Sequence, residues 1–129
     1  MKYFPKHLII VLFSVAILGC SGVQPQSKTK WVGYTETGQA SYYGDQYRFK
    51  ETASGETYSH DLKTAAHRSI PFGSKLKVTN VDNGKSVIVE VNDRGPFVKG
   101  RIVDLSKSAF TSIGNTSSGL INVQIDVIE

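Results

Sequence analysis

Asp93 stands at the end of a strand-like segment and is a candidate for chemistry. Valines alternate at positions 87, 89 and 91, and the same period places Asp93 on the buried face. Arg94 follows, and Gly95-Pro96 then ends the strand, because proline has no amide hydrogen to donate. A single Asp-Arg-Gly sequence is also typical of a turn whose carboxylate binds backbone amides. Asp93 is therefore a candidate site residue with a purely structural alternative.

Glu56 and His67 are two further residues that can transfer protons. Glu56 ends the small, turn-forming sequence TASGE, and His67 follows two alanines. Taken singly, a loop glutamate is usually solvated, and such a histidine usually has a structural partner. Together with Asp93 they are typical of a site that cleaves glycosidic bonds, which commonly uses two carboxylates in one cleft. This interpretation requires a fold that brings the three residues together.

The elements that must position these residues are short strands. Apolar and alternating segments predict strands over residues 39–43, 75–81, 86–92, 101–105 and 120–128. Asn83-Gly84 predicts a hairpin between the second and third of these strands, with positive φ at both central residues. So many short strands favour a closed or nearly closed small barrel, because closure removes exposed strand edges. A sandwich is the alternative for this all-β chain.

One helix is predicted directly after residue 105. Ser106 can cap its start, and Gly114 can take the left-handed position that closes it. Its apolar face consists of Ala109, Phe110 and Ile113. Residues 62–66 fit either a single helical turn or a short strand, so the fold has one or two short helices.

Composition limits the chain to one globular domain and excludes several kinds of site. Of the 129 residues, 40% are apolar and 20% charged, which suits one domain and accessory sequence. The net charge is +4, but without Lys2 and Lys6 13 basic residues face 11 acidic ones, so we expect no nucleic-acid partner. The three histidines and the single cysteine lack the paired spacings of metal sites. We therefore expect neither a metal nor a cofactor.

The N-terminal residues predict export and a lipid anchor. Residues 1–19 combine a positive start with an apolar run that is shorter than the roughly 20 residues of a membrane span. The sequence Ile-Leu-Gly-Cys that ends at Cys20 resembles the lipobox of bacterial lipoproteins, which implies cleavage before Cys20 and a lipid on it. Residues 20–37 then form a polar tether, and Ser21 implies the periplasmic face of the outer membrane. An ordinary signal peptide or a short uncleaved anchor is the alternative.

The rest of the chain resembles the rare lipoprotein A family over about residues 34–128. The shared motifs are GQASYYG at 38–44, TASGE at 52–56, TAAHRSIPFG at 64–73, VTNVDNGKSVIVEVNDRGPF at 78–97 and GRIVDLSKSAF at 100–110. The resemblance implies a six-stranded double-psi β-barrel over residues 38–129. The characterised active members of the family are periplasmic lytic transglycosylases, which cleave peptidoglycan glycan strands, preferably strands stripped of stem peptides.

Matching the motifs assigns site residues to this chain. The family's catalytic acid falls on Glu56, its essential histidine on His67 and its second carboxylate on Asp93. One departure lies before TASGE, where relatives often have glycine near Phe49, so we expect a different shape for the rim of the cleft. Apart from the family's motifs, Tyr42, Tyr43, Tyr47 and Arg94 are expected to bind the sugar, the tyrosines by stacking on its faces. Ordinary packing is the alternative for the three tyrosines.

The expected reaction is an intramolecular cleavage. Glu56 protonates the glycosidic oxygen while the C6 hydroxyl of N-acetylmuramic acid attacks the anomeric carbon, which leaves a 1,6-anhydro end. Asp93 supplies negative charge near the oxocarbenium-like transition state, and His67 orients or polarises. The alternatives are a glycan-binding barrel without cleavage, like expansins, and a structural outer-membrane lipoprotein. We expect a monomer whose partners are glycan strands and, through Cys20, the membrane.

Overall fold

The computed structural model describes residues 30–129 of the chain. The predicted signal peptide, Cys20 and most of the predicted tether lie outside the described residues, so the lipid anchor and the outer-membrane location stay predictions. Within the part that is described, no helix has the length and apolar character needed to cross a membrane.

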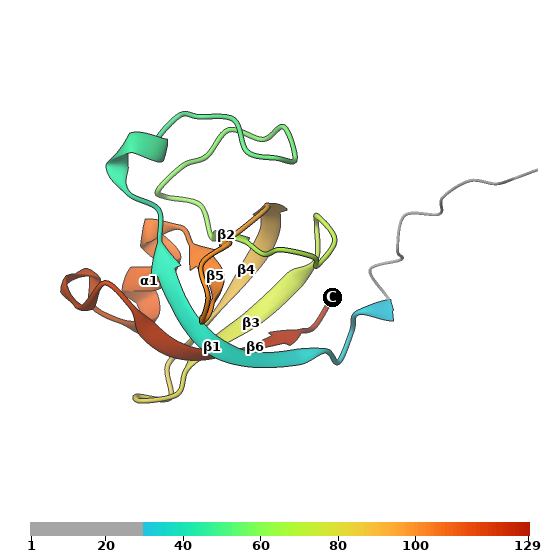
Figure 1. Ribbon diagram of the computed structural model, residues 1–129, viewed down its shortest axis with the longest axis vertical. Coiled ribbons are helices and arrows are strands. Elements are labelled where there is room, and N and C mark those ends of the chain that lie inside the picture. Colours follow the sequence, from blue (N-terminus) through green and yellow to red (C-terminus); the bar gives the residue numbers. More distant parts are fainter. Residues whose placement is uncertain (1–29) are drawn as a thin grey trace, which may run out of the picture.

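Six strands close into a barrel (Figure 1). Their order around the barrel is β1-β5-β2-β4-β3-β6, which confirms the predicted closed barrel over the sandwich. The strands are β1 Thr35–Tyr42, β2 Thr64–Ala66, β3 Lys75–Asn80, β4 Ser86–Asp93, β5 Arg101–Leu105 and β6 Ile121–Val127. The other elements named within residues 30–129 are α1 Lys107–Ile113, an α-helix, and the 3-10 helices η2 Asp45–Tyr47 and η3 Thr116–Ser118.

The segment that sequence reasoning left open, residues 62–66, contains strand β2. Its two alanines are buried, because β2 is part of the barrel wall and is paired on both sides, with β5 and with β4. β2 runs parallel to β4, with Ala66 beside Asp93, and antiparallel to β5. The residues that directly follow β2 therefore emerge at the same end of the barrel as the end of β4.

The helix prediction is correct at its start and wrong at its end. The Ser106 hydroxyl accepts a hydrogen bond from the Ala109 amide, as expected for an N-cap. Gly114, however, has φ −158°, which is extended and not left-handed. A side chain at Gly114 would lie 3.2 Å from Cγ2 of Ile121, so close packing against β6 explains the glycine better than a turn requirement.

The hairpin between β3 and β4 is confirmed, but its turn differs from the prediction. The strands pair antiparallel from Lys75 opposite Glu90 to Thr79 opposite Ser86. Gly84 has positive φ, whereas Asn83 does not. Among positions 30–129, Phe49 is the sole non-glycine residue with positive φ. The Asn83 side chain instead donates to the Ile113 carbonyl, which fastens the turn to the end of α1.

Candidate functional site

A pocket of about 420 Å³ opens at the end of the barrel where β4 stops. It contains five residues that the sequence assigned to a site: Tyr42, Tyr43, Tyr47, Asp93 and Arg94. Glu56 and His67 are not among its lining residues. The remaining lining residues are Gly95, Pro96, Phe97, Val98, Arg101 and Asp104.

Both carboxylate oxygens of Asp93 are engaged by the protein. Oδ1 accepts hydrogen bonds from the amides of Ala53 and Arg94, each at 2.9 Å. Oδ2 accepts a hydrogen bond from the Tyr43 hydroxyl at 2.6 Å. The structural role considered for Asp93 is therefore present, and it extends to a loop forty residues away in sequence. The three hydrogen bonds also hold the negatively charged Asp93 carboxylate in one position on the wall of the pocket.

Glu56 lies on a turn that is attached to the end of β4. The Thr52 amide donates to the Glu56 carbonyl at 2.8 Å, and Gly55 closes the turn with φ +92°. The Ser54 amide donates to the Asn92 carbonyl, next to the bond between Ala53 and Asp93. TASGE and NDRGPF are thus neighbours in space, as the sequence hypothesis required. The Glu56 side chain is exposed to solvent and has one long contact, 3.5 Å from the Ser54 hydroxyl.

The hydrogen bonds of the His67 imidazole go to Glu36, Ser69 and Ile70 and not to Glu56 or Asp93. Its backbone amide donates to the Asp93 carbonyl, so the AAH motif does meet the end of β4. The ring is buried, with Nε2 3.0 Å from the carboxylate of Glu36 on β1. Nδ1 accepts hydrogen bonds from the amides of Ser69 and Ile70. Nδ1 therefore carries no proton, Nε2 donates to Glu36, and the ring orders the loop after β2.

Protonation of His67 is expected to destabilise the fold. Burial lowers the pKa of His67 below its ordinary value of 6.5, and this outweighs the opposite effect of Glu36. The pKa of His67 is lower in the folded state than in the unfolded state. The contribution of neutral His67 to the free energy of unfolding is therefore complete at pH values above the unfolded-state pKa, and it is lost as pH falls through the folded-state pKa. Urea unfolding at pH 7.5, 6.5 and 5.5 should show a decline in the free energy of unfolding that is smaller in His67→Gln. Equal declines in the two proteins would contradict this account.

Arg94 connects the loop after β2 to the loop after β4. Its guanidinium donates to the carbonyls of Ile70 at 2.8 Å and His67 at 3.3 Å, and it lies 4.0 Å from the centre of the Phe72 ring. Its contact with Asp93 is made by the backbone amide and not by the guanidinium. Burial lowers the pKa of Arg94 from its ordinary, very high value. An arginine side chain remains charged in proteins, so Arg94 places a positive charge beside the pocket.

The three tyrosines differ in how far they are available to a ligand. Tyr42 packs on Phe110 and donates to the Thr116 carbonyl. Tyr43 is buried, and burial together with the hydrogen bond to Asp93 raises its pKa, so it remains a neutral donor. Tyr47 is 44% exposed on η2, with its ring edge-on to Tyr43. Of the three, Tyr47 is the one with a ring face open to a sugar.

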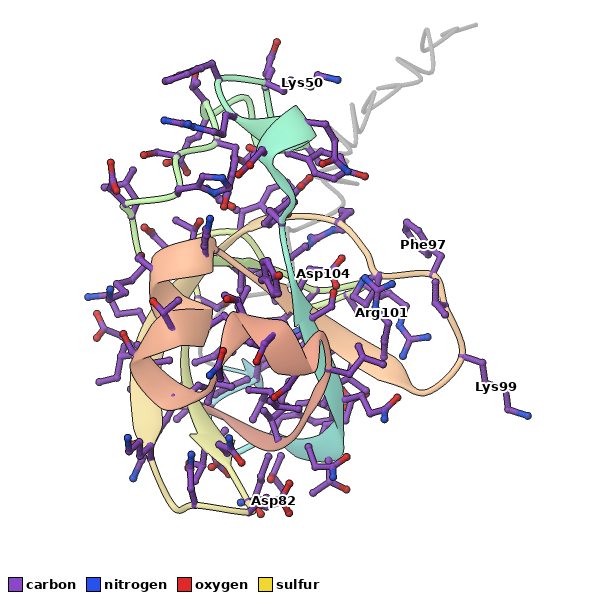
Figure 2. The ribbon with its side chains drawn as sticks, turned by 90° about the vertical axis from the view of Figure 1, so that its left-hand side faces the viewer. Lys50, Asp82, Phe97, Lys99, Arg101 and Asp104 are labelled. Carbon is purple, nitrogen blue, oxygen red and sulfur yellow. The ribbon has the colours of Figure 1, made fainter. Side chains whose placement is uncertain are left out.

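Phe97 is a pocket residue that sequence reasoning did not single out. It is 79% exposed and its neighbour Val98 is 53% exposed, both in the loop between β4 and β5. Figure 2 shows Phe97 and Lys99 projecting outward from this loop, Phe97 above Arg101 and Asp104 in this view and Lys99 below them. Such exposure of a large apolar ring at a pocket mouth is typical of a binding surface. Its place in the motif NDRGPF was the available signal.

Asp104 and Arg101 were also missed, although they lie in the quoted motif GRIVDLS. Both are in β5 and line the pocket, and Nη2 of Arg101 is 2.5 Å from Oδ1 of Asp104. The Ser41 hydroxyl on β1 donates to the same oxygen. A charged residue inside a five-residue strand that is otherwise largely apolar was the signal for Asp104.

Phe49 has the backbone conformation expected where relatives often carry glycine. Its φ is +64°, in the left-handed region that favours glycine, and its ring is 76% exposed. The Phe49 amide donates to the Tyr58 carbonyl, so the pairing across this loop holds the conformation in place. At this position the loop thus presents an exposed aromatic side chain from a backbone conformation that favours glycine.

Comparison with known proteins connects this site to one family. A family model described as lytic transglycolase matches residues 35–125. The endolytic peptidoglycan transglycosylase RlpA of Vibrio cholerae is 52% identical over 96 residues, which cover 74% of this chain and 36% of that protein. The protein of the same name from Campylobacter jejuni is 50% identical over 97 residues, covering 75% and 35%. The chain thus spans about a third of the length of these curated relatives.

Solved structures with lower sequence identity share the fold. The Streptomyces papain inhibitor superimposes with a TM-score of 0.63 at 20% identity, covering 76% of this chain and 97% of that one. An expansin from Clavibacter michiganensis superimposes with a TM-score of 0.59 at 23% identity, covering 74% and 51%. These likenesses agree with the predicted six-stranded double-psi β-barrel.

Proposed function

Because the chain belongs to the lytic transglycolase family, as its resemblance to rare lipoprotein A proteins predicted, we propose that its barrel cleaves peptidoglycan glycan strands. The products are glycans that end in 1,6-anhydro-N-acetylmuramic acid. The observation that carries the proposal is the hydrogen bond between the Ala53 amide and Asp93, which joins TASGE to NDRGPF beside the pocket. Two carboxylates are thereby held on adjoining segments, as cleavage of a glycosidic bond requires.

In the proposed reaction Glu56 is the general acid. Its exposed side chain has freedom to reach the glycosidic oxygen of a strand lying along the pocket. When protonated, it donates its proton to that oxygen as the bond to the anomeric carbon breaks. The C6 hydroxyl of the same sugar forms the new bond to the anomeric carbon, so no water is consumed.

Asp93 and His67 support this step in different ways. Asp93 places a fixed negative charge at the wall of the pocket, where an oxocarbenium-like transition state carries positive charge. His67 acts through position, because its ring orders the loop whose carbonyls bind Arg94. The role that fits its geometry is therefore orientation and not proton transfer to the sugar.

The direct test of the proposed function is product analysis. The full chain, purified in mild detergent, is incubated with glycan strands that carry no stem peptides and with intact peptidoglycan. Mass spectrometry should detect new 1,6-anhydro ends, with more of them from the peptide-free strands. If neither substrate yields anhydro ends above the no-protein control, the proposed function is wrong.

Phe97 is expected to bind the sugar by stacking. Its exposed ring at the pocket mouth offers an apolar face to a pyranose, so Phe97→Ala should weaken glycan binding about tenfold, or roughly 1.4 kcal/mol. Binding is measured by calorimetry with peptide-free strands in a Glu56→Gln background, in which turnover is expected to be slow. Phe97→Trp should retain binding, and Phe49→Ala is the matched control, since Phe49 is equally exposed but does not line the pocket. Equal losses in Phe97→Ala and Phe49→Ala would contradict a stacking role.

A glycan-binding barrel without cleavage is the second candidate. The observation in its favour is that both oxygens of Asp93 are already engaged by the protein. This candidate predicts tight binding of glycan strands with no anhydro ends, and the same incubation distinguishes it from the proposed function.

A further inference from the structure

A row of four residues crosses neighbouring strands at the level of the pocket. Ser41 on β1 pairs with Asp104 on β5, which pairs with Ala66 on β2, which in turn pairs with Asp93 on β4. The backbones of neighbouring strands lie about 4.8 Å apart, so the Cα atoms of Asp93 and Asp104, two strand spacings from each other, are separated by about 10 Å. Both line the pocket, and the residue between them has the small side chain of alanine. The pocket therefore has a carboxylate on each of two walls.

The carboxylate of Asp104 is held by one oxygen alone. Oδ1 accepts from the Ser41 hydroxyl and from Nη2 of Arg101, both at 2.5 Å. Ser41 in turn accepts from Arg101 at 2.7 Å, so the three side chains form a closed ring. No hydrogen bond from any residue between 30 and 129 reaches Oδ2 of Asp104.

Asp93 has the opposite arrangement. Its Oδ1 binds two amides and its Oδ2 binds the Tyr43 hydroxyl, so neither oxygen is left without a protein donor. Of the two pocket carboxylates, Asp104 is thus the one with an oxygen available to a ligand. Its side chain is 19% exposed, which is sufficient for one oxygen to contact a sugar.

We propose that Asp104 is a catalytic residue of this pocket and that its Oδ2 accepts the proton of the attacking hydroxyl. The proposal rests on the proposed function. As the C6 oxygen bonds to the anomeric carbon, its proton passes to Oδ2 of Asp104, and Glu56 gives a proton to the departing glycosidic oxygen. Asp104 ends protonated and Glu56 ionised, and proton exchange with solvent restores both, so no other reactant is needed.

Ser41 and Arg101 are positioning residues for this step. They hold Oδ1 of this pocket-lining residue with two hydrogen bonds, which restricts the orientation of the carboxylate and leaves Oδ2 without a donor among residues 30–129. Figure 2 shows Arg101 and Asp104 close together at the base of the loop that carries Phe97.

The first test compares Asp104→Asn with Asp126→Asn in the full chain. Asparagine can keep its oxygen against Ser41 and Arg101, so the fold should survive while the free oxygen becomes an amide nitrogen. Release of anhydro ends from peptide-free strands should fall about 10²- to 10⁴-fold in kcat, with KM within about threefold. Asp126 is a part-buried carboxylate on β6 that binds Gln124 and does not line the pocket, so Asp126→Asn should keep the wild-type rate. A rate for Asp104→Asn within threefold of wild type would overturn the proposal.

The second test separates a proton acceptor from a structural residue. Asp104→Gly removes the carboxylate and leaves space, and sodium formate at increasing concentration should restore release of anhydro ends at least tenfold. Sodium chloride at equal ionic strength should not. A lost rate without formate rescue, in a variant whose circular dichroism is that of wild type, overturns the role as proton acceptor. If wild type itself forms no anhydro ends, the proposed function has failed; if wild type is active and Asp104→Asn is too, only the present proposal has.

Discussion

Replacing Glu56 by glutamine should slow release of anhydro ends by about 10²- to 10⁴-fold, the range for loss of a general acid. The amide has nearly the shape of the carboxyl group but cannot protonate the glycosidic oxygen. The fold should not change, because the side chain is exposed and the turn is held by the backbone of Glu56, which accepts from Thr52. Glycan binding should therefore stay close to the wild-type value while kcat falls.

Glu51→Gln is the matched control for this experiment. Glu51 is exposed on the same loop and pairs with Thr57 through a single β-bridge. Its replacement by glutamine removes the same charge as Glu56→Gln. Initial rates for wild type, Glu56→Gln and Glu51→Gln are compared by liquid chromatography of the released glycans. Equal rates in the two variants would show that Glu56 acts as surface charge and not as the acid.

The second large effect is expected at Asp93, where two substitutions separate charge from structure. In Asp93→Asn the side-chain oxygen can still accept from the amides of Ala53 and Arg94, and its nitrogen can donate to the Tyr43 hydroxyl. This variant loses the charge and keeps the hydrogen bonds. Its rate should fall about 10²-fold, while its free energy of unfolding changes by less than about 1 kcal/mol.

Asp93→Ala should lose both properties. Two amides and one hydroxyl lose their acceptor, which costs about 3 kcal/mol and releases the turn that carries Glu56. Urea unfolding and initial rates, measured for both variants, check the separation. A fully active Asp93→Asn would mean that Asp93 has only the turn role, and an equally destabilised Asp93→Asn would mean that its charge supports the fold.

The strands and the helix start were predictable because their signals are local. Alternating valines in β4 and alternating isoleucines and valines in β6 identify strands with one buried face. The turn at Asn83 and the end of α1 at Gly114 were predicted incorrectly, because tertiary contacts decide them. Asn83 binds the Ile113 carbonyl, and Gly114 packs against Ile121, and neither contact is visible in the local pattern.

The site was predictable only where one motif lies against another through the backbone. The convergence of TASGE, AAH and NDRGPF follows from bonds that the amides and carbonyls at the end of β4 make. The direction of the His67 ring depends on Glu36, a β1 residue that no motif marked. Asp104 and Phe97 enter the pocket through strand register and loop shape, which residue types alone do not specify.

The reaction in water enriched in oxygen-18 tests the central claim most directly. The proposed cleavage uses the C6 hydroxyl of the sugar itself, so anhydro ends formed from peptide-free strands by the full chain should carry no oxygen-18 in mass spectra. Their number should rise with time and with protein concentration. New reducing ends that contain oxygen-18 would instead show hydrolysis, and the absence of new ends of either kind would show that the chain does not cleave the strands; each result would contradict the account.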